Sequence, residues 1–421
     1  MGNVPWIILT TLQIVLLLPL AFISFNKSSL WRVLLFPSLW LLTESIRARF
    51  PFGGFGWGRV AFSQADAPYA SLARIGGAPL LTFTVAVIAV GLFLLISYRK
   101  FWIPIGITSL ITLLSLTLNL SKVLPASDNF SIVAVQGGVP SLGLDFNSRA
   151  TAVFENHLRR TGEYLQSRNG IPDLVLWPEN AIDVDPFSNR KVWDELQELT
   201  DKFHVPIIVG AVLQKSDHFQ NASLLWKPVV GPTSIYIKKH LTPFGEYIPL
   251  RKIAEVVSPY AKDVVDFLPG KDIVIHEIGA AKLAPIICFE LLDDSLGRAM
   301  AKRSNAMVIQ TNSATFGLSP ESEQQLGIAR IRSIEHQRYS MSVSTSGISA
   351  LIDPQGRVTY QTQKNESAVI DAVIKLENSH SISDKFGLQI ELLLLLSPLG
   401  ILFWLVFTRR TSRKLLPKPK G

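Results

Sequence analysis

Residues 283–311 read LAPIICFELLDDSLGRAMAKRSNAMVIQT and contain the clearest signal for the fold class. Two short apolar runs, 283–287 and 306–311, are predicted as strands, and residues 295–302 between them are predicted as a helix. Short apolar strands that alternate with helices indicate a layered α/β fold. Active residues of such folds lie on loops at strand ends, and Cys288 directly follows the first run.

The same alternation continues on both sides of this segment. Strands are predicted at 130–136, 173–177, 206–212, 222–227, 234–237, 340–345 and 348–352, and helices at 150–166, 191–203 and 322–338. Residues 122–387 as a whole are mixed in polarity. They are therefore predicted to form one water-soluble α/β domain.

Long apolar stretches flank this domain and indicate a membrane protein. The chain is 48% hydrophobic over 421 residues, which is high for a soluble protein. Apolar stretches occupy residues 6–25, 33–45, 79–98, 101–120 and 388–407. We expect three parts: a helical transmembrane domain of about four spans at 1–128, an extracytoplasmic domain at 129–380, and a last transmembrane helix with a cytoplasmic tail at 381–421.

The net charge of +8 arises from 41 Lys and Arg against 33 Asp and Glu. Nucleic-acid binding is one explanation, but the positive-inside bias of membrane proteins is favoured because six basic residues fall in 409–421, directly after an apolar stretch. This tail is predicted to be cytoplasmic, which places the α/β domain and the N-terminus on the outer face. Four arginines then lie in an outside connection, where we expect contact with lipid phosphate: Arg47, Arg49, Arg59 and Arg74.

Only one cysteine is present, which excludes an intrachain disulfide and any cysteine-based metal cluster. No HExxH or Walker-type motif occurs, and no cofactor is expected. Gly54, Gly56 and Gly58 lie in a loop rich in Phe and Trp, without the strand–turn–helix context of a dinucleotide site.

Three polar sites follow predicted strands. In WPENA, Pro178 ends a strand and presents Glu179. In YIKKHLTPFGE, a strand leads to Lys238 and then to a turn that ends at Glu246. In PIICFE, Cys288 is followed by Glu290 within two residues. Each site alone is also explained by a structural role: a solvated loop glutamate, a basic surface turn or a small buried cysteine.

Together the three sites contain what acyl transfer through a thiol requires. A carboxylate can take the thiol proton and later return it to a leaving group. An ammonium can favour the thiolate and stabilise the oxyanion of a tetrahedral intermediate. The thiol then holds the acyl group as a thioester, which an amine attacks.

Residues 130–375 resemble the carbon–nitrogen hydrolase, or nitrilase, superfamily with its Glu–Lys–Cys triad, and are most similar to its membrane branch, the apolipoprotein N-acyltransferases. The strings that carry this resemblance are VQGGVP (135–140), LWPENA (176–181), KKHLTPFGEYIP (238–249), IICFE (286–290), ARIRSIEHQR (329–338) and IDPQGRV (352–358). The third string is the most specific, because soluble nitrilases do not carry it whole.

The resemblance implies a nitrilase-like αββα sandwich inserted into a helical transmembrane domain of the cell membrane. It implies Glu179 as general base, Lys238 as oxyanion-stabilising lysine and Cys288 as nucleophile. Supporting roles are expected for Glu246, Glu290, Phe289 and Asn221, and substrate contacts for Phe146, Phe244 and Phe316. A phospholipid would donate the acyl chain and a diacylglyceryl-modified apolipoprotein would accept it, without metal or cofactor.

Three departures from the family pattern bear on substrate binding and topology. The family has seven spans before the soluble domain, whereas about four are predicted here. Loss of three spans, an odd number, would turn the N-terminus outward. A mis-assigned start codon or a shortened natural version would each explain the difference. The Asp and Trp of the family's Asn-Asp-x-Trp-Phe-Gly stretch are absent from 312–317. The tryptophan usual after the VQG strand is also absent, with Phe146 the nearest aromatic residue.

Two alternative functions remain open from the sequence. One is a membrane-tethered amidase of the same superfamily that hydrolyses a carbon–nitrogen bond. The other is a non-catalytic module that keeps the fold and binds lipoprotein.

Overall fold

The computed structural model describes residues 11, 14–18, 20, 29–98, 102–120, 128–138, 151–257, 262, 264–314, 316–317 and 319–414. Most of the predicted span 6–25, the basic tail from 415 onward and Phe146 lie outside the described residues.

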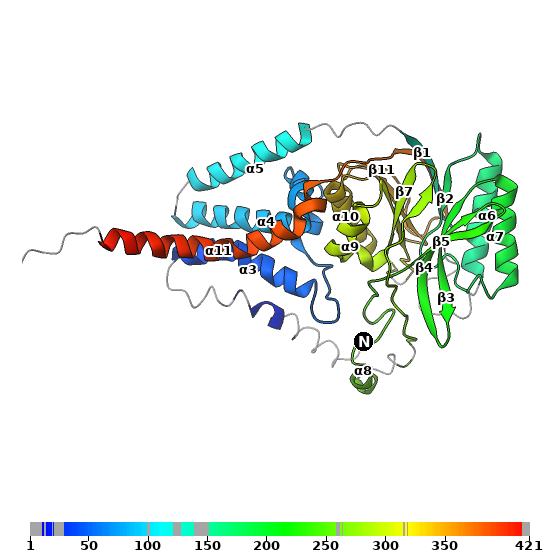
Figure 1. Cartoon of the computed structure of the whole chain (residues 1–421), viewed down its shortest axis with the longest axis horizontal. Helices are drawn as coiled ribbons and strands as arrows, with labels where there is room; N and C mark the ends of the chain where they lie inside the picture. Colours follow the sequence, from blue (N-terminus) through cyan, green and yellow to red (C-terminus); the bar gives the residue numbers. More distant parts are fainter. Residues whose placement is uncertain are drawn as a thin grey trace, which may run out of the picture.

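Two six-stranded sheets form the centre of the described chain (Figure 1). The first sheet has the order β12-β1-β2-β3-β4-β5, and its strands are β1 (Asn129–Gln136), β2 (Leu174–Leu176), β3 (Ile207–Lys215), β4 (His218–Lys227), β5 (Gly231–Ile237) and β12 (Ala368–Lys375). The second has the order β11-β10-β9-β8-β7-β6, with β6 (His276–Ile278), β7 (Ala281–Ile287), β8 (Ala306–Thr311), β9 (Ser340–Ser344), β10 (Ala350–Ile352) and β11 (Val358–Gln361). The inner strands β1, β2 and β3 pair in parallel, as do β7, β8 and β9.

The sheets pack face to face, and a helical layer covers the outer face of each. Helices α6 (Ala152–Ser167) and α7 (Arg190–Phe203) pack on the first sheet, and α9 (Asp294–Ala301) and α10 (Glu321–His336) on the second. Strand β1 shows why its sequence is almost continuously apolar: Ile132 faces the other sheet and Val133 faces α6. Alternate residues of a strand point to opposite faces, so a strand buried on both faces has no polar side. The predicted αββα sandwich is confirmed.

The strands predicted from the sequence are all present, and three further strands were not predicted. These are β6, β11 and β12. Strand β12 pairs with β1 over its whole length, but its outer position leaves five of its eight residues partly or fully exposed. A mixed pattern of this kind at a sheet edge is difficult to separate from a loop by periodicity alone.

A separate helical part lies beyond α9 and α10, at the opposite end of the molecule from α6 and α7 (Figure 1). It comprises α3 (Ser29–Arg47), α4 (Ala73–Tyr98), α5 (Trp102–Leu120) and α11 (Ile382–Lys414). These helices contain four of the five predicted apolar stretches. By length and composition, one segment of the described chain, Ala70–Ser97, is sufficient to cross a membrane.

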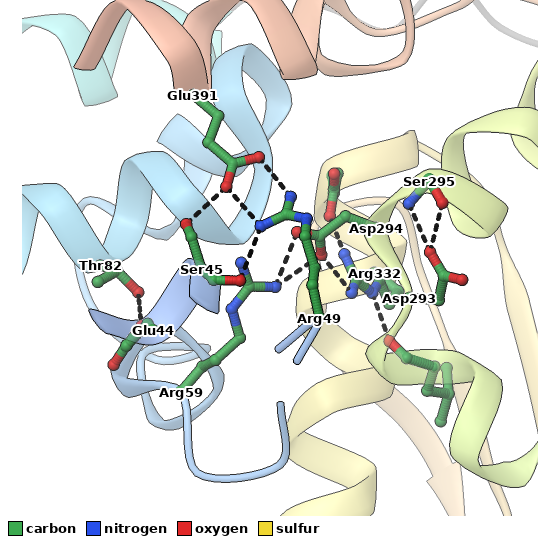
Figure 2. Close-up of polar contacts among 12 residues, drawn as sticks. Glu44, Ser45, Arg49, Arg59, Thr82, Asp293, Asp294, Ser295, Arg332 and Glu391 are labelled. Carbon is green, nitrogen blue, oxygen red and sulfur yellow. Dashed lines mark hydrogen bonds and ion pairs between the residues drawn. The ribbon is translucent and has the colours of Figure 1, made fainter. Parts of the chain in front are cut away.

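Polar contacts hold this helical part together (Figure 2). Arg49 donates to both carboxylate oxygens of Glu391 at 2.9 and 2.7 Å, and Ser45 donates to the same group at 2.6 Å. Glu44 accepts from Thr82 at 2.6 Å. Residues that are distant in the sequence therefore join α3 to α4 and α11.

The four arginines expected to contact lipid phosphate have hydrogen-bond or ion-pair partners inside the protein. Arg47 donates to the carbonyl of Gly58 at 2.9 Å and Arg74 to that of Leu118 at 2.5 Å, while Arg49 pairs with Glu391. The side chain of Arg59 is fully buried. The burial of Arg59 excludes contact with lipid phosphate, whereas for Arg47, Arg49 and Arg74 that contact stays a prediction.

Candidate active site

Glu179, Lys238 and Cys288 each follow a strand. Glu179 follows β2, Lys238 follows β5, and Cys288 follows β7 and begins the short helix η5 (Cys288–Leu292). Glu179 and Lys238 are buried, with 4% and 1% of their surface exposed, and Cys288 is partly buried. The ammonium of Lys238 pairs with Glu179, and the charges of both act on the Cys288 thiol, so the three predicted side chains lie together although their stretches are far apart in the sequence.

The Lys238 ammonium lies between two carboxylates. Its Nζ is 3.2 Å from Glu179 Oε1 and 2.9 Å from Glu246 Oε2, and it donates to Thr242 Oγ1 at 3.4 Å. Burial acts to lower the pKa of Lys238, but the two negative charges outweigh it and raise the pKa above its ordinary value. The lysine is therefore a fixed positive charge at neutral pH.

Asn221 bridges the two carboxylates. Its Nδ2 donates to Glu179 Oε1 at 2.7 Å and to Glu246 Oε1 at 2.8 Å. The backbone N–H of Asn312 donates to the second oxygen of Glu179 at 2.8 Å, and that of Thr242 to Glu246 at 2.7 Å. Burial acts to raise the pKa of Glu246, but Lys238 and Asn221 lower it overall. Both carboxylates are consequently held in one orientation.

The Cys288 thiol lies at a strained turn beside this cluster. Its backbone φ is +48°, in the left-handed region that non-glycine residues rarely adopt. Gln325 donates from its side-chain amide to Sγ at 3.5 Å. Burial and the charge of Glu179 raise the thiol's pKa above its ordinary value, although Lys238 acts in the opposite direction. The resting thiol is therefore neutral, and a base must remove its proton before it can attack.

Glu290 joins two segments of the site. One is the loop 238–246 that begins at Lys238, called the lysine loop, and the other is the turn at 287–288 that carries Cys288, called the nucleophile turn. Its Oε1 accepts from Tyr236 Oη at 2.6 Å, from Lys239 N at 2.7 Å and from His240 N at 3.3 Å, while Oε2 accepts from Ile287 N at 2.9 Å. Burial raises the pKa of Glu290. Its contacts are those of a residue that holds two loops together.

Phe289 packs inward from the same turn. It is 3% exposed, and its ring centroid lies 5.8 Å from that of Phe55 and 5.3 Å from that of His240. The imidazole of His240 also pairs with Asp293 at 3.3 Å. Phe289 therefore anchors the turn against the loop rich in Phe and Trp.

The residues predicted to contact substrate are placed less uniformly. Phe316 packs edge to face on Trp57, with ring centroids 6.1 Å apart, and Trp57 donates to Gln324 at 2.6 Å. Phe244 is 63% exposed on the loop after Lys238. Their contacts with substrate stay predictions.

Two features of the site were not identified from the sequence. Gln325 occurs in a helix whose surrounding residues are also polar, so nothing in the pattern separates it from solvated neighbours. No role at the active site was predicted for Trp57 or for the loop rich in Phe and Trp to which it belongs. Both residues meet the site only because α10 and the N-terminal loop pack beside η5.

A cavity of about 930 Å³ is lined in part by Lys239, His240 and Leu241, which directly follow Lys238. Its lining includes Arg49, Phe52, His240 and Asp293. It therefore borders both the loop that follows α3 and the residues that follow Cys288.

Comparison with known proteins shows the family to which the chain belongs. Residues 1–91 match the model of the apolipoprotein N-acyltransferase N-terminal domain, and residues 134–383 match that of the carbon–nitrogen hydrolase family. An apolipoprotein N-acyltransferase of Mycolicibacterium smegmatis is 30% identical over 81% of this chain and 63% of its own length. One of Pseudomonas putida is 30% identical over 82% of this chain and 69% of its own length.

The chain thus spans about two thirds of the length of these relatives. Among solved structures, XC1258 of Xanthomonas campestris, a CN-hydrolase superfamily protein, aligns with a TM-score of 0.44 at 17% identity, over 59% of this chain and 91% of its own. On the two family matches and the identity to curated relatives, the chain belongs to the apolipoprotein N-acyltransferase family of carbon–nitrogen hydrolases.

Proposed function

We propose that this protein is an apolipoprotein N-acyltransferase in which Cys288 carries the acyl group. It takes a fatty acyl chain from a phospholipid and passes it to the N-terminal amine of a diacylglyceryl-cysteine on a lipoprotein. The observation that supports this most directly is the buried Lys238 ammonium between Glu179 and Glu246, beside a neutral thiol. Family membership supports the choice of lipoprotein as acceptor.

In the first half-reaction, Glu179 takes the thiol proton and Cys288 Sγ attacks the carbonyl carbon of the phospholipid ester. The Lys238 ammonium stabilises the resulting oxyanion. Collapse of this intermediate breaks the ester bond, and the leaving alcohol takes the proton from Glu179. The products are a thioester on Cys288 and a lysophospholipid.

In the second half-reaction, the lipoprotein amine attacks the thioester carbonyl. Glu179 accepts the proton that the amine loses, and Lys238 again faces the oxyanion. The thiolate leaves, takes that proton from Glu179 and restores the starting thiol, while the amide remains on the lipoprotein.

Glu246 has a separate role in this scheme. When Glu179 carries a proton, it no longer neutralises Lys238. Glu246 Oε2, at 2.9 Å from Nζ, still does, so the buried ammonium is paired throughout the cycle. Asn221 holds Glu246 and Glu179 apart at a constant distance through its shared amide.

The proposed location is the cell membrane, with several spans and the catalytic domain on the outer face. The proposed parts are a transmembrane domain at 1–128, a catalytic domain at 129–380, and a last span with a basic tail at 381–421. The apolar segment Ala70–Ser97, the packing of α11 along α3 and α4, and the basic residues after 408 support this arrangement.

Mass spectrometry of the intact protein after incubation with phospholipid tests the proposal. We expect one added acyl chain on Cys288, its transfer to a diacylglyceryl-cysteine peptide, and neither step in Cys288→Ala. A wild-type protein that releases ammonia from a soluble amide but gains no acyl chain from phospholipid would instead be the tethered amidase.

A further inference from the structure

A buried cluster of charges lies beside the segment that follows Cys288 (Figure 2). Arg59 donates from Nη1 to both oxygens of Asp294 at 2.8 Å each, and Arg332 donates from Nη2 to the first of them at 2.7 Å. The side chains of Arg59, Asp294 and Arg332 are 0%, 5% and 1% exposed. We call these three residues the arginine clamp.

The clamp connects three elements that are distant in the sequence. Arg59 precedes the short helix η1 (Val60–Ser63) between α3 and α4, Asp294 opens α9, and Arg332 lies on α10. The ring of Phe62 lies against both arginines, with its centroid 5.8 Å from one guanidinium carbon and 5.5 Å from the other. An N-terminal side chain is thereby bound to the segment that follows Cys288.

The clamp also reaches the turn itself. Arg332 donates from Nε to the carbonyl of Leu291 at 2.7 Å, and Leu291 belongs to η5, the helix that Cys288 begins. Asp294 follows η5 by two residues. One end of η5 is thus held by Glu290 and the other end by the clamp.

Both ends of η5 have to be fixed because Cys288 has an unfavourable backbone conformation. A non-glycine residue at φ +48° persists only where the surrounding structure imposes that geometry. A turn that is released at one end can relax, and relaxation would move Sγ away from Glu179 and Lys238.

Electrostatics makes the clamp strong. Burial acts to raise the pKa of Asp294, but the charges of Arg59, Arg332 and Arg298 outweigh it and hold the pKa well below its usual range. Asp294 therefore stays ionised, and bonds between a guanidinium and an ionised carboxylate are among the stronger hydrogen bonds in proteins.

We propose that Arg59 and Arg332 are positioning residues for Cys288, and that the N-terminal part of the chain is thereby a component of the catalytic apparatus. The proposal rests on the proposed function, because it assumes that Cys288 is the nucleophile of N-acylation. It predicts that removal of Arg59 slows turnover although Arg59 lies beside the segment that follows Cys288 and not at Cys288 itself.

The test uses the full-length protein and the variant Arg59→Met. Asp294 keeps Arg332 as a partner in this variant, so its charge stays paired. We expect kcat for N-acylation to fall about 10- to 100-fold with KM little changed, because small displacements of reacting groups have effects of this size.

Alkylation by iodoacetamide provides a second readout that needs no lipid and reports on Cys288 alone, the only cysteine. A relaxed turn exposes the thiol, and its pKa returns toward the ordinary value. Alkylation near pH 8 should therefore be faster, by about tenfold for each pKa unit recovered. Faster alkylation together with slower turnover distinguishes misplacement of the thiol from a general loss of stability.

The matched control is Arg168→Met. Arg168 also makes a double contact with a carboxylate, that of Asp371, at 2.6 and 3.2 Å, but it lies on the outer side of the first sheet. We expect this variant to unfold at a lower temperature with wild-type alkylation and kcat. Arg59→Lys, which keeps the charge, should recover part of the lost turnover. If Arg59→Met does not fold, the same measurements are made on Arg59→Lys.

The proposal is overturned if folded Arg59→Met alkylates and turns over as the wild type does. It is also overturned if Arg168→Met shows the same combination of changes. If the wild-type protein transfers no acyl chain, the proposed function fails, but the alkylation comparison still decides whether the clamp positions the thiol.

Discussion

Replacement of Lys238 by methionine should destabilise the protein. It should also reverse the way in which the contribution of Glu246 to stability depends on pH. The variant keeps a side chain of similar length but leaves Glu179 and Glu246 without the ammonium that lies 3.2 and 2.9 Å from them. Removing one partner of a buried ion pair costs about 3–5 kcal/mol, because the remaining charge stays buried. We therefore expect a loss of about this size at pH 7.

The sign of the pH effect follows from Glu246. In the wild type its pKa is lowered, so its contribution to stability is present above the unfolded value of about 4.5 and is lost as pH falls through the folded value. Without Lys238, burial dominates and the pKa of Glu246 rises. Its contribution to stability is then present at low pH and is lost as pH rises. The difference in the free energy of unfolding between the wild type and Lys238→Met should therefore widen from pH 4.5 to pH 7.

Thermal unfolding of both proteins across this pH range measures the effect. The matched control is Lys191→Met, because Lys191 also lies between two carboxylates, Glu155 at 3.0 Å and Glu195 at 3.8 Å, but is 61% exposed. We expect little change in that variant, since water screens surface pairs. The prediction is wrong if Lys238→Met is as stable as the wild type at pH 7, or if the difference in stability between the two proteins does not change with pH.

Three further substitutions test the remaining contacts of the site. Gln325→Leu removes the donor to Sγ, which should raise the thiol's pKa further and move the pH profile of iodoacetamide alkylation upward; an unchanged profile would show that this contact is not made in solution. Glu290→Gln replaces one carboxylate oxygen by an NH2 group, so the N–H of either Ile287 or Lys239 loses its acceptor, and the free energy of unfolding, measured by denaturant titration, should fall by about 1–3 kcal/mol. Glu179→Gln should fold but form no thioester with phospholipid in a mass spectrum, and acylation at the wild-type rate would exclude Glu179 as the base.

The strands and the ends at which the reactive residues lie could be predicted from the sequence. Local alternation and apolar runs depend on neighbours along the chain, and β8 begins and ends where the pattern indicated. Edge strands such as β12 could not be predicted in this way, because their exposed side removes the signal.

The groups that could perform acyl transfer were predictable from the sequence, because Glu179, Lys238 and Cys288 lie in strings that the family shares. Their surroundings became known only from the packing of the folded chain. Gln325 reaches the thiol from α10, and Arg59, which charge counting assigned to lipid, is bound to Asp294 across 235 residues. A side chain's partner is set by the packing of distant segments, and the periodicity of a single segment carries no information about that packing.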